Sequence, residues 1–163
     1  MAEPPFRLLF TGARAATDRT VIVCALADEA AKLQPVEGRR PIVLVHGGSV
    51  DRKGNPVGAD WIADDIWRGW GRQWPDRFLE PEVHPAKDHS TPLARNDHMV
   101  GLGADACCAV ASAFASGTGH CARAARAADI PTQDYGWPTE RRIARQSAPK
   151  PDPQPTLGTT PAG

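Results

Sequence analysis

The stretch Pro41-Ile-Val-Leu-Val-His46-Gly-Gly48 is the part of the sequence that decides the fold. Its four consecutive aliphatic residues show no alternation between polar and apolar side chains. A strand of this kind is covered on both faces, which is typical of a parallel sheet between two layers of helices. The two glycines that follow predict a turn at the carboxyl end of the strand. We therefore expect an α/β protein.

Strand and helix patterns alternate on both sides of this stretch. Strands are expected at 6–11, at 41–46, within 77–83, at 105–111 and at 130–134. Helices are expected from the capping residue Asp18 to Leu33, at 59–70, from Thr91 to Gly101 or Gly103, and at 118–128. This order predicts a Rossmann-like open parallel sheet of about five strands with helices on both faces.

The chain of 163 residues has room for one domain, which we expect at 5–138. Residues 139–163 begin with a short basic patch of Arg141, Arg142 and Arg145. A Pro-rich stretch with one large apolar side chain follows, so we expect a disordered tail there. The basic patch is interpreted as a solvated helix end or as a contact for an acidic or phosphate-bearing partner.

The charge balance argues against some classes of partner. Nineteen basic residues balance nineteen acidic ones, which disfavours nucleic acid as a partner. The sequence has no apolar run of membrane-spanning length and no evident secretory signal, so we expect a cytoplasmic protein with no membrane partner. The basic residues are fifteen Arg and only four Lys, which is typical of a GC-rich bacterial or phage genome.

Three glycine-bearing turns follow expected strands, and parallel strands bring their carboxyl ends to one edge of the sheet. These turns are Thr11-Gly12-Ala13-Arg14, His46-Gly47-Gly48 and Ser116-Gly117-Thr118-Gly119-His120. Such turns expose backbone N–H groups ahead of a helix, which suits phosphate binding. Arg14 is interpreted as a phosphate ligand, with a surface salt bridge as its alternative role.

Further ligand-binding candidates lie on two of the expected helices. Asp60, after Gly58, is expected either to cap its helix or to bind ribose hydroxyls. Arg95 and Met99 share a helix face, and we expect Arg95 to face the ligand with Met99 packed below it. The role of Asn96 is either base or ribose binding or helix capping.

Two stretches fit the dinucleotide pattern G-x-G-x-x-A. Gly101-Leu-Gly103-Ala-Asp-Ala106 ends an expected helix and precedes a strand, so we interpret it as a helix stop. Gly117-Thr-Gly119-His-Cys-Ala122 follows a strand and opens a helix, which is the context of a phosphate turn. Packing alone is the alternative role of these glycines.

The order of these motifs resembles the SLOG superfamily of Rossmann-like proteins, in its YspA/cpYpsA-related branch. The resemblance extends over Arg7 to Thr132. It is carried by the motifs quoted above together with Gly58-Ala-Asp60, His84-Pro-Ala86, Arg95-Asn96-x-x-Met99 and Ala128-Asp-Ile-Pro131. It implies a nucleotide-derived ligand held over the strand ends. The superfamily includes the LOG phosphoribohydrolases, which cleave a base from a nucleoside monophosphate, the DNA-processing protein DprA, and domains that sense NAD-derived signals.

The sequence departs from the LOG enzymes at their catalytic residue. Cys121 stands where the LOG turn carries its catalytic Glu, so no carboxylate is available there. We therefore expect binding of an ADP-ribose- or NAD-related molecule, for sensing or sequestration, rather than catalysis. The alternative is a nucleotide N-glycosidase or phosphoribohydrolase with Asp60 or Asp97 as its acid. DprA-like DNA binding is disfavoured by the neutral charge.

Cysteine and histidine spacing predicts no metal site and no cofactor. Cys24, Cys107, Cys108 and Cys121 lack zinc-knuckle or redox spacing and are expected to be reduced core residues, with the adjacent pair on opposite faces of a strand. His46, His84, His89, His98 and His120 are interpreted as scattered, solvated residues, of which His120 is kept as a ligand-binding candidate. Trp67, Trp70 and Trp74 are expected to pack in the core or between subunits, with stacking on a base as their alternative role, which leaves a homo-oligomer open.

Overall fold

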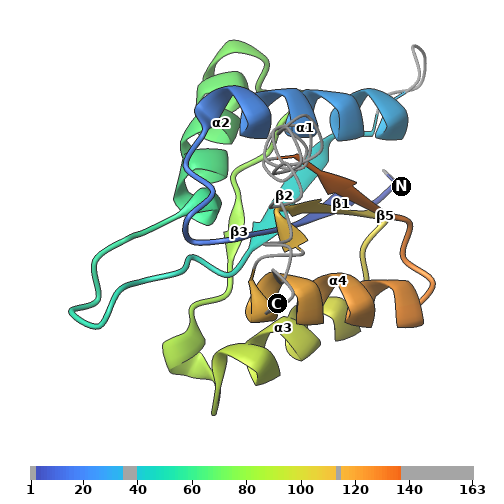
Figure 1. The fold of residues 1–163 in the computed structure, drawn as a ribbon. Helices are drawn as coiled ribbons and strands as arrows, with labels where there is room; N and C mark the ends of the chain where they lie inside the picture. The colour runs from blue at the N-terminus through green and yellow to red at the C-terminus, as the bar shows by residue number, and fades with distance from the viewer. Residues whose placement is uncertain (1–2, 35–39, 113–114, 137–163) are drawn as a thin grey trace, which may run out of the picture.

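The computed structural model describes residues 3–34, 40–112 and 115–136 (Figure 1). The expected tail at 139–163, with Arg141, Arg142 and Arg145, lies outside these residues. Five parallel strands form one sheet in the order β3-β2-β1-β4-β5. They are β1 (Phe6–Gly12), β2 (Ile42–His46), β3 (Glu82–Val83), β4 (Ala106–Val110) and β5 (Thr132–Tyr135). The α/β open parallel sheet expected from the sequence is confirmed.

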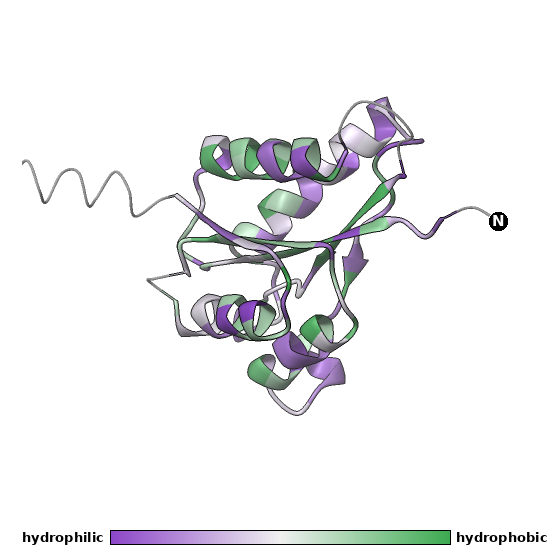
Figure 2. Cartoon of the chain, turned by 90° about the vertical axis from the view of Figure 1, so that its right-hand side faces the viewer, coloured by the Kyte–Doolittle hydropathy of each residue, from purple (hydrophilic) through white to green (hydrophobic). Residues whose placement is uncertain are grey.

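Helices cover both faces of the sheet. They are α1 (Arg19–Leu33), α2 (Ala59–Gln73), α3 (Pro92–Gly101) and α4 (Ser116–Ala127), with a short 3-10 helix η1 (Ala86–Asp88) before α3. The helices α1 and α2 lie on one face, and α3 and α4 lie on the other (Figures 1 and 2). No helix within the described residues is long and apolar enough to cross a membrane.

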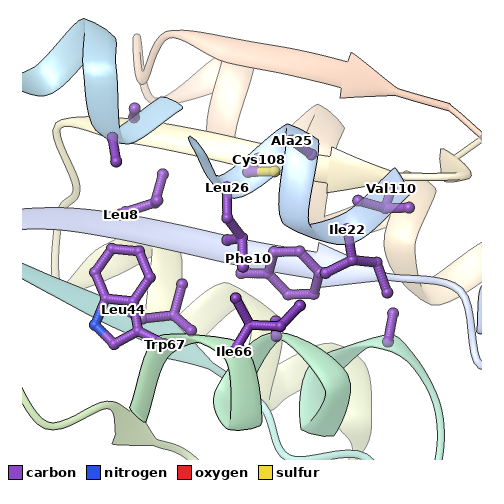
Figure 3. Close-up of a cluster of buried hydrophobic side chains, with 14 of the residues drawn as sticks. Leu8, Phe10, Ile22, Ala25, Leu26, Leu44, Ile66, Trp67, Cys108 and Val110 are labelled. Carbon is purple, nitrogen blue, oxygen red and sulfur yellow. The ribbon is translucent and has the colours of Figure 1, made fainter. Parts of the chain in front are cut away.

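The two faces of the sheet have separate cores. On the α1/α2 side, Leu8 and Phe10 of β1 pack with Trp67 of α2 and Cys108 of β4 (Figure 3). Leu9 lies on the opposite side, in the core beneath α3 and α4. Residues that alternate along a strand point to alternate faces, which produces this division. The expected separation of Cys107 and Cys108 is confirmed because they belong to different cores.

Two element boundaries differ from the sequence prediction. The helix α2 continues to Gln73, through Gly69 and Gly71, instead of ending at Trp70. The third strand is only two residues long, although Phe78 forms an isolated parallel bridge with Ile42. Pro81 has no N–H to donate, which accounts for the interrupted ladder between this bridge and β3.

The aromatic and cysteine predictions are confirmed only in part. Trp67 is fully buried, and its ring centroid lies 5.0 Å from that of Phe78, so it is a core residue. Trp74 is 46% exposed. Cys24 is also exposed, so its assignment to the core was wrong, because it lies on the outer side of α1.

The direction of chain connection reverses between β1 and β4. The unit β1-α1-β2 runs toward one edge of the sheet, and β4-α4-β5 runs toward the other. At such a point two neighbouring strands send their connections to opposite faces, which leaves a crevice beyond their carboxyl ends. The structure has a cavity at this crevice.

Candidate functional site

A cavity of about 600 Å³ lies beyond the carboxyl ends of β1, β2 and β4. The end of β1 and the residues after it form one wall, and the first turns of α2 and α4, the helix α3 from Pro92 to Met99, and the loop after β2 form the others. The structure brings together at this cavity most of the ligand-binding residues expected from the sequence: Gly12, Arg14, Gly47, Asp60, Arg95, Asn96, Gly117 and Thr118.

The other four expected residues, which are Gly48, Gly58, Gly119 and His120, do not line the cavity. A Cβ at Gly58, where φ is +84°, would lie 2.8 Å from the Cα of Arg14, so this glycine allows two loops to touch. Gly48 also has positive φ. A Cβ at Gly119 would lie 3.1 Å from the carbonyl oxygen of Ser112, which follows β4. His120 is held by Asp97, whose Oδ1 lies 2.7 Å from His120 Nε2.

Arg95 is the buried cation of the cavity wall and is only 6% exposed. Its Nη1 donates hydrogen bonds to the carbonyl oxygens of Gly47, at 2.5 Å, and of His84, at 3.2 Å. Its Nε donates to Asn96 Oδ1 at 2.8 Å. The guanidinium plane is therefore fixed by α3 and by the residues that follow β2 and β3.

No carboxylate forms a salt bridge with Arg95 in the part of the chain that the structure describes. Its three hydrogen-bond acceptors are all neutral. Burial lowers the pKa of this guanidinium, which the charge of Asp60 partly offsets. An arginine stays ionised even so, and a buried charge ordinarily has an opposite charge close to it. The cavity therefore favours an anionic ligand.

The amino termini of α2 and α4 lie at the same cavity. Side chains cap α1 and α3, through Asp18 and Thr91 respectively. Among the residues that the structure describes, no side chain caps α2 or α4. The first N–H groups of a helix have no partner within it, and the helix dipole adds a partial positive charge there. The start of α4 lines the cavity through Ser116, Gly117 and Thr118. Beside Arg95, this helix terminus is a second feature of the cavity that favours an anion.

Asn96 and Asp60 form other contacts than the helix caps that were one of the two roles expected for each. Asn96 caps nothing: its Oδ1 accepts from Arg95 and its Nδ2 donates to the Gly117 carbonyl at 3.2 Å. It thereby links α3 to α4. Asp60 Oδ2 accepts from the backbone N–H and the hydroxyl of Ser49, at 3.2 and 3.1 Å. Its carboxylate closes the loop between β2 and α2 and also lines the cavity.

His46 has a supporting role that the sequence interpretation missed. The Nδ1 atom accepts from the Gly48 N–H at 3.0 Å, so Nε2 carries the proton and donates to Asp64 Oδ2 at 2.8 Å. Burial raises the pKa of Asp64, but hydrogen bonds from His46 and Arg68 outweigh it and hold that pKa below its ordinary value. Because His46 is fully buried, its interpretation as a solvated residue was wrong. Its function is to fix the Gly47-Gly48 turn.

The interpretation of the histidines as scattered was also wrong for three others. His84, His89 and His98 lie together beside η1, with one ring nitrogen from each within 4.8 Å of the others. They are spaced five and nine residues apart, and no local pattern reveals that a 3-10 helix and α3 bring them together.

Cys121 lies in the core and is absent from the cavity lining. Burial raises the pKa of its thiol to about 11, so it is protonated at neutral pH. A buried thiol in this state is chemically inert. The expected packing role of Cys121 agrees with these surroundings.

Comparison with known proteins places the chain beside a phage protein. No family model and no solved structure matches it. It is 38% identical over 136 residues to the Gene 61 protein of Mycobacterium phage D29, a match that covers 80% of this chain and 96% of the relative. The source of this relative fits the bacterial or phage genome suggested by the arginine content. The chain belongs to the family of the phage D29 Gene 61 protein.

Proposed function

We propose that the cavity at the end of the sheet binds a nucleotide-derived ligand, such as an ADP-ribose- or NAD-related molecule, for sensing or sequestration. The observation that carries the proposal is the position of Arg95 on the wall of this cavity. Arg95 is a buried cation that forms no salt bridge with a described residue, and the first residues of α4 line the same cavity. The resemblance to the SLOG superfamily adds support, because residues from five of the motifs that carry it line this cavity.

The phosphate groups of the ligand would lie between Arg14 and the first turn of α4. Arg14 is exposed, lines the cavity and forms no salt bridge with a described residue. A guanidinium and a row of backbone N–H groups are the usual protein donors to phosphate oxygens. The two arginines outnumber the single lining carboxylate, Asp60, so the local charge favours an anion.

The remaining lining suits a ribose and a base. Asp60 has one carboxylate oxygen, Oδ1, that no described residue occupies, and ribose hydroxyls are donors of the kind it would accept. Pro92, Leu93 and Met99 give the cavity an apolar side on α3. The volume of about 600 Å³ lies within the usual range for small-molecule sites.

Titration calorimetry of the purified chain with ADP-ribose, NAD and AMP tests the proposal. We expect binding by the wild type and a loss of roughly ten- to a hundredfold in affinity for Arg95→Met or Arg14→Ala, since a charged hydrogen bond contributes about 1.5–3 kcal/mol. Arg19→Ala is the matched control, because Arg19 pairs with Asp65 on the outside of α1 and does not line the cavity. Failure of all three compounds to bind at millimolar concentration would exclude the proposal.

A nucleotide N-glycosidase is the second candidate, and the position of Asp60 favours it. Of the two acids considered from the sequence, Asp60 lines the cavity, whereas Asp97 is exposed and pairs with His120. A carboxylate beside a ribose can stabilise positive charge developing at C1′. Mass spectrometry after prolonged incubation separates the two candidates: an intact nucleotide supports binding, and a free base that disappears with Asp60→Asn supports hydrolysis.

A further inference from the structure

Three histidine side chains lie close together outside the cavity, beside η1 and α3. His84 directly follows β3, His89 directly follows η1, and His98 lies in the last turn of α3. One ring nitrogen from each lies within 4.8 Å of the other two. We propose that His84, His89 and His98 bind a divalent transition-metal ion of the zinc class.

The ring geometry is compatible with three ligands of one ion. The ring centroids of His84 and His98 lie 5.4 Å apart at 63°, and those of His89 and His98 lie 4.8 Å apart at 42°. No described residue forms a hydrogen bond with the ring of His89 or His98. A tetrahedral ion with Zn–N bonds of about 2.0–2.1 Å would hold its ligand nitrogens roughly 3.4 Å apart, which small rotations of these rings achieve.

His84 already has the partner that orients a metal-binding imidazole. Its Nε2 lies 2.6 Å from Glu82 Oε1, which leaves Nδ1 as the ligand atom. Arg7 in turn holds Glu82 through two hydrogen bonds of 2.8 and 3.0 Å. A carboxylate on the far nitrogen fixes the tautomer and raises the basicity of a histidine ligand.

The ion would tie the end of β3 to η1 and α3. His84 and Arg95 are linked, because the carbonyl oxygen of His84 accepts a hydrogen bond from Arg95 Nη1. His98 lies on the same helix as Arg95. Three protein ligands leave a fourth position for water, and two of the histidines are half-buried while His98 is exposed, so an ion has access from solvent. This site lies outside the nucleotide cavity and does not depend on it.

Titration of the untagged, EDTA-treated chain with ZnCl2 tests the proposal directly. We expect one zinc ion per chain, a higher melting temperature, and slower hydrogen exchange over residues 84–101. His98→Ala keeps the fold because His98 is exposed, and it should lose at least about tenfold in zinc affinity. Cobalt binding should give the visible absorption of a tetrahedral nitrogen site, which His89→Ala removes.

Two control variants separate this site from other zinc ligands. His120→Ala removes a histidine that pairs with Asp97 away from the cluster, and Cys24→Ser removes the exposed thiol. Both should bind zinc as the wild type does. Equal zinc affinity in the wild type and His98→Ala, or no binding with zinc in molar excess, would overturn the proposal.

Discussion

Substitution of Gly47 by alanine should displace the guanidinium of Arg95 and weaken ligand binding. A Cβ built at Gly47 lies 2.8 Å from Arg95 Nε and still closer to Cζ and Nη1. Atoms that are not bonded to each other do not approach that closely, so the added methyl group must displace the guanidinium of Arg95. The displaced group loses its hydrogen bonds to the Gly47 and His84 carbonyls. Loss of its charged hydrogen bond to a phosphate costs about 1.5–3 kcal/mol, or roughly ten- to a hundredfold in affinity.

The same substitution should lower the free energy of unfolding. Forcing an extra methyl group into a packed interior costs about 1–3 kcal/mol, although the adjoining cavity offers the arginine somewhere to go. Urea unfolding measures this change, and calorimetry with ADP-ribose measures the affinity. Gly101→Ala is the control, because a Cβ at Gly101 meets nothing within 4 Å.

A double-mutant cycle decides whether Gly47 acts through Arg95. The three atoms closest to the added Cβ all belong to Arg95, so Gly47→Ala should cost little in a chain that already carries Arg95→Ala. An equal cost in both backgrounds would refute the reasoning, since the clash would then involve the backbone instead of the guanidinium.

Three further predictions concern the parts that support the site. The pKa of Asp64 in the folded protein lies below its ordinary value of 3.8. The contribution of this carboxylate to the free energy of unfolding is therefore complete above pH 3.8 and is lost as the pH falls through the lower pKa of the folded state. Urea unfolding across this acid range should show that loss, and Asp64→Asn should remove it. In the native protein a thiol reagent should modify Cys24 and spare Cys121, and Cys121→Ala should leave ligand affinity unchanged. Asp18→Ala and Thr91→Ala should each lower the free energy of unfolding by about 1 kcal/mol by loss of a helix cap, measured by urea denaturation.

Local sequence predicts those features whose physical cause is also local. The aliphatic run at 42–45 forms a strand that is buried on both faces, as its lack of polar residues predicts. Asp18 caps α1 by accepting hydrogen bonds from N–H groups in the first turn of that helix. The glycine turns lie at the cavity because parallel strands end at a common edge. The position of the cavity was therefore predictable from the expectation of a parallel sheet with glycine turns after its strands.

The roles of individual side chains were not predictable in this way. Arg95 hydrogen-bonds to a carbonyl 48 residues away, and Asn96 to one 21 residues away, so their partners depend on how α3 docks. The cluster of His84, His89 and His98 depends on the same docking and on η1, which has no signature in the sequence. Such contacts emerge only when the tertiary structure is formed.

The zero net charge of the chain and an excess of cations at the cavity are compatible because several acidic residues pair with basic ones away from the cavity. Glu82 pairs with Arg7, Asp64 with Arg68, and Asp134 with Arg126. Arg14 and Arg95 form no such pair among the described residues, and both line one cavity. A neutral total argues against a long polyanion, whose affinity grows with the number of phosphates neutralised. It does not argue against a compact phosphate ligand, for which two guanidinium groups and one helix terminus at a single cavity are sufficient.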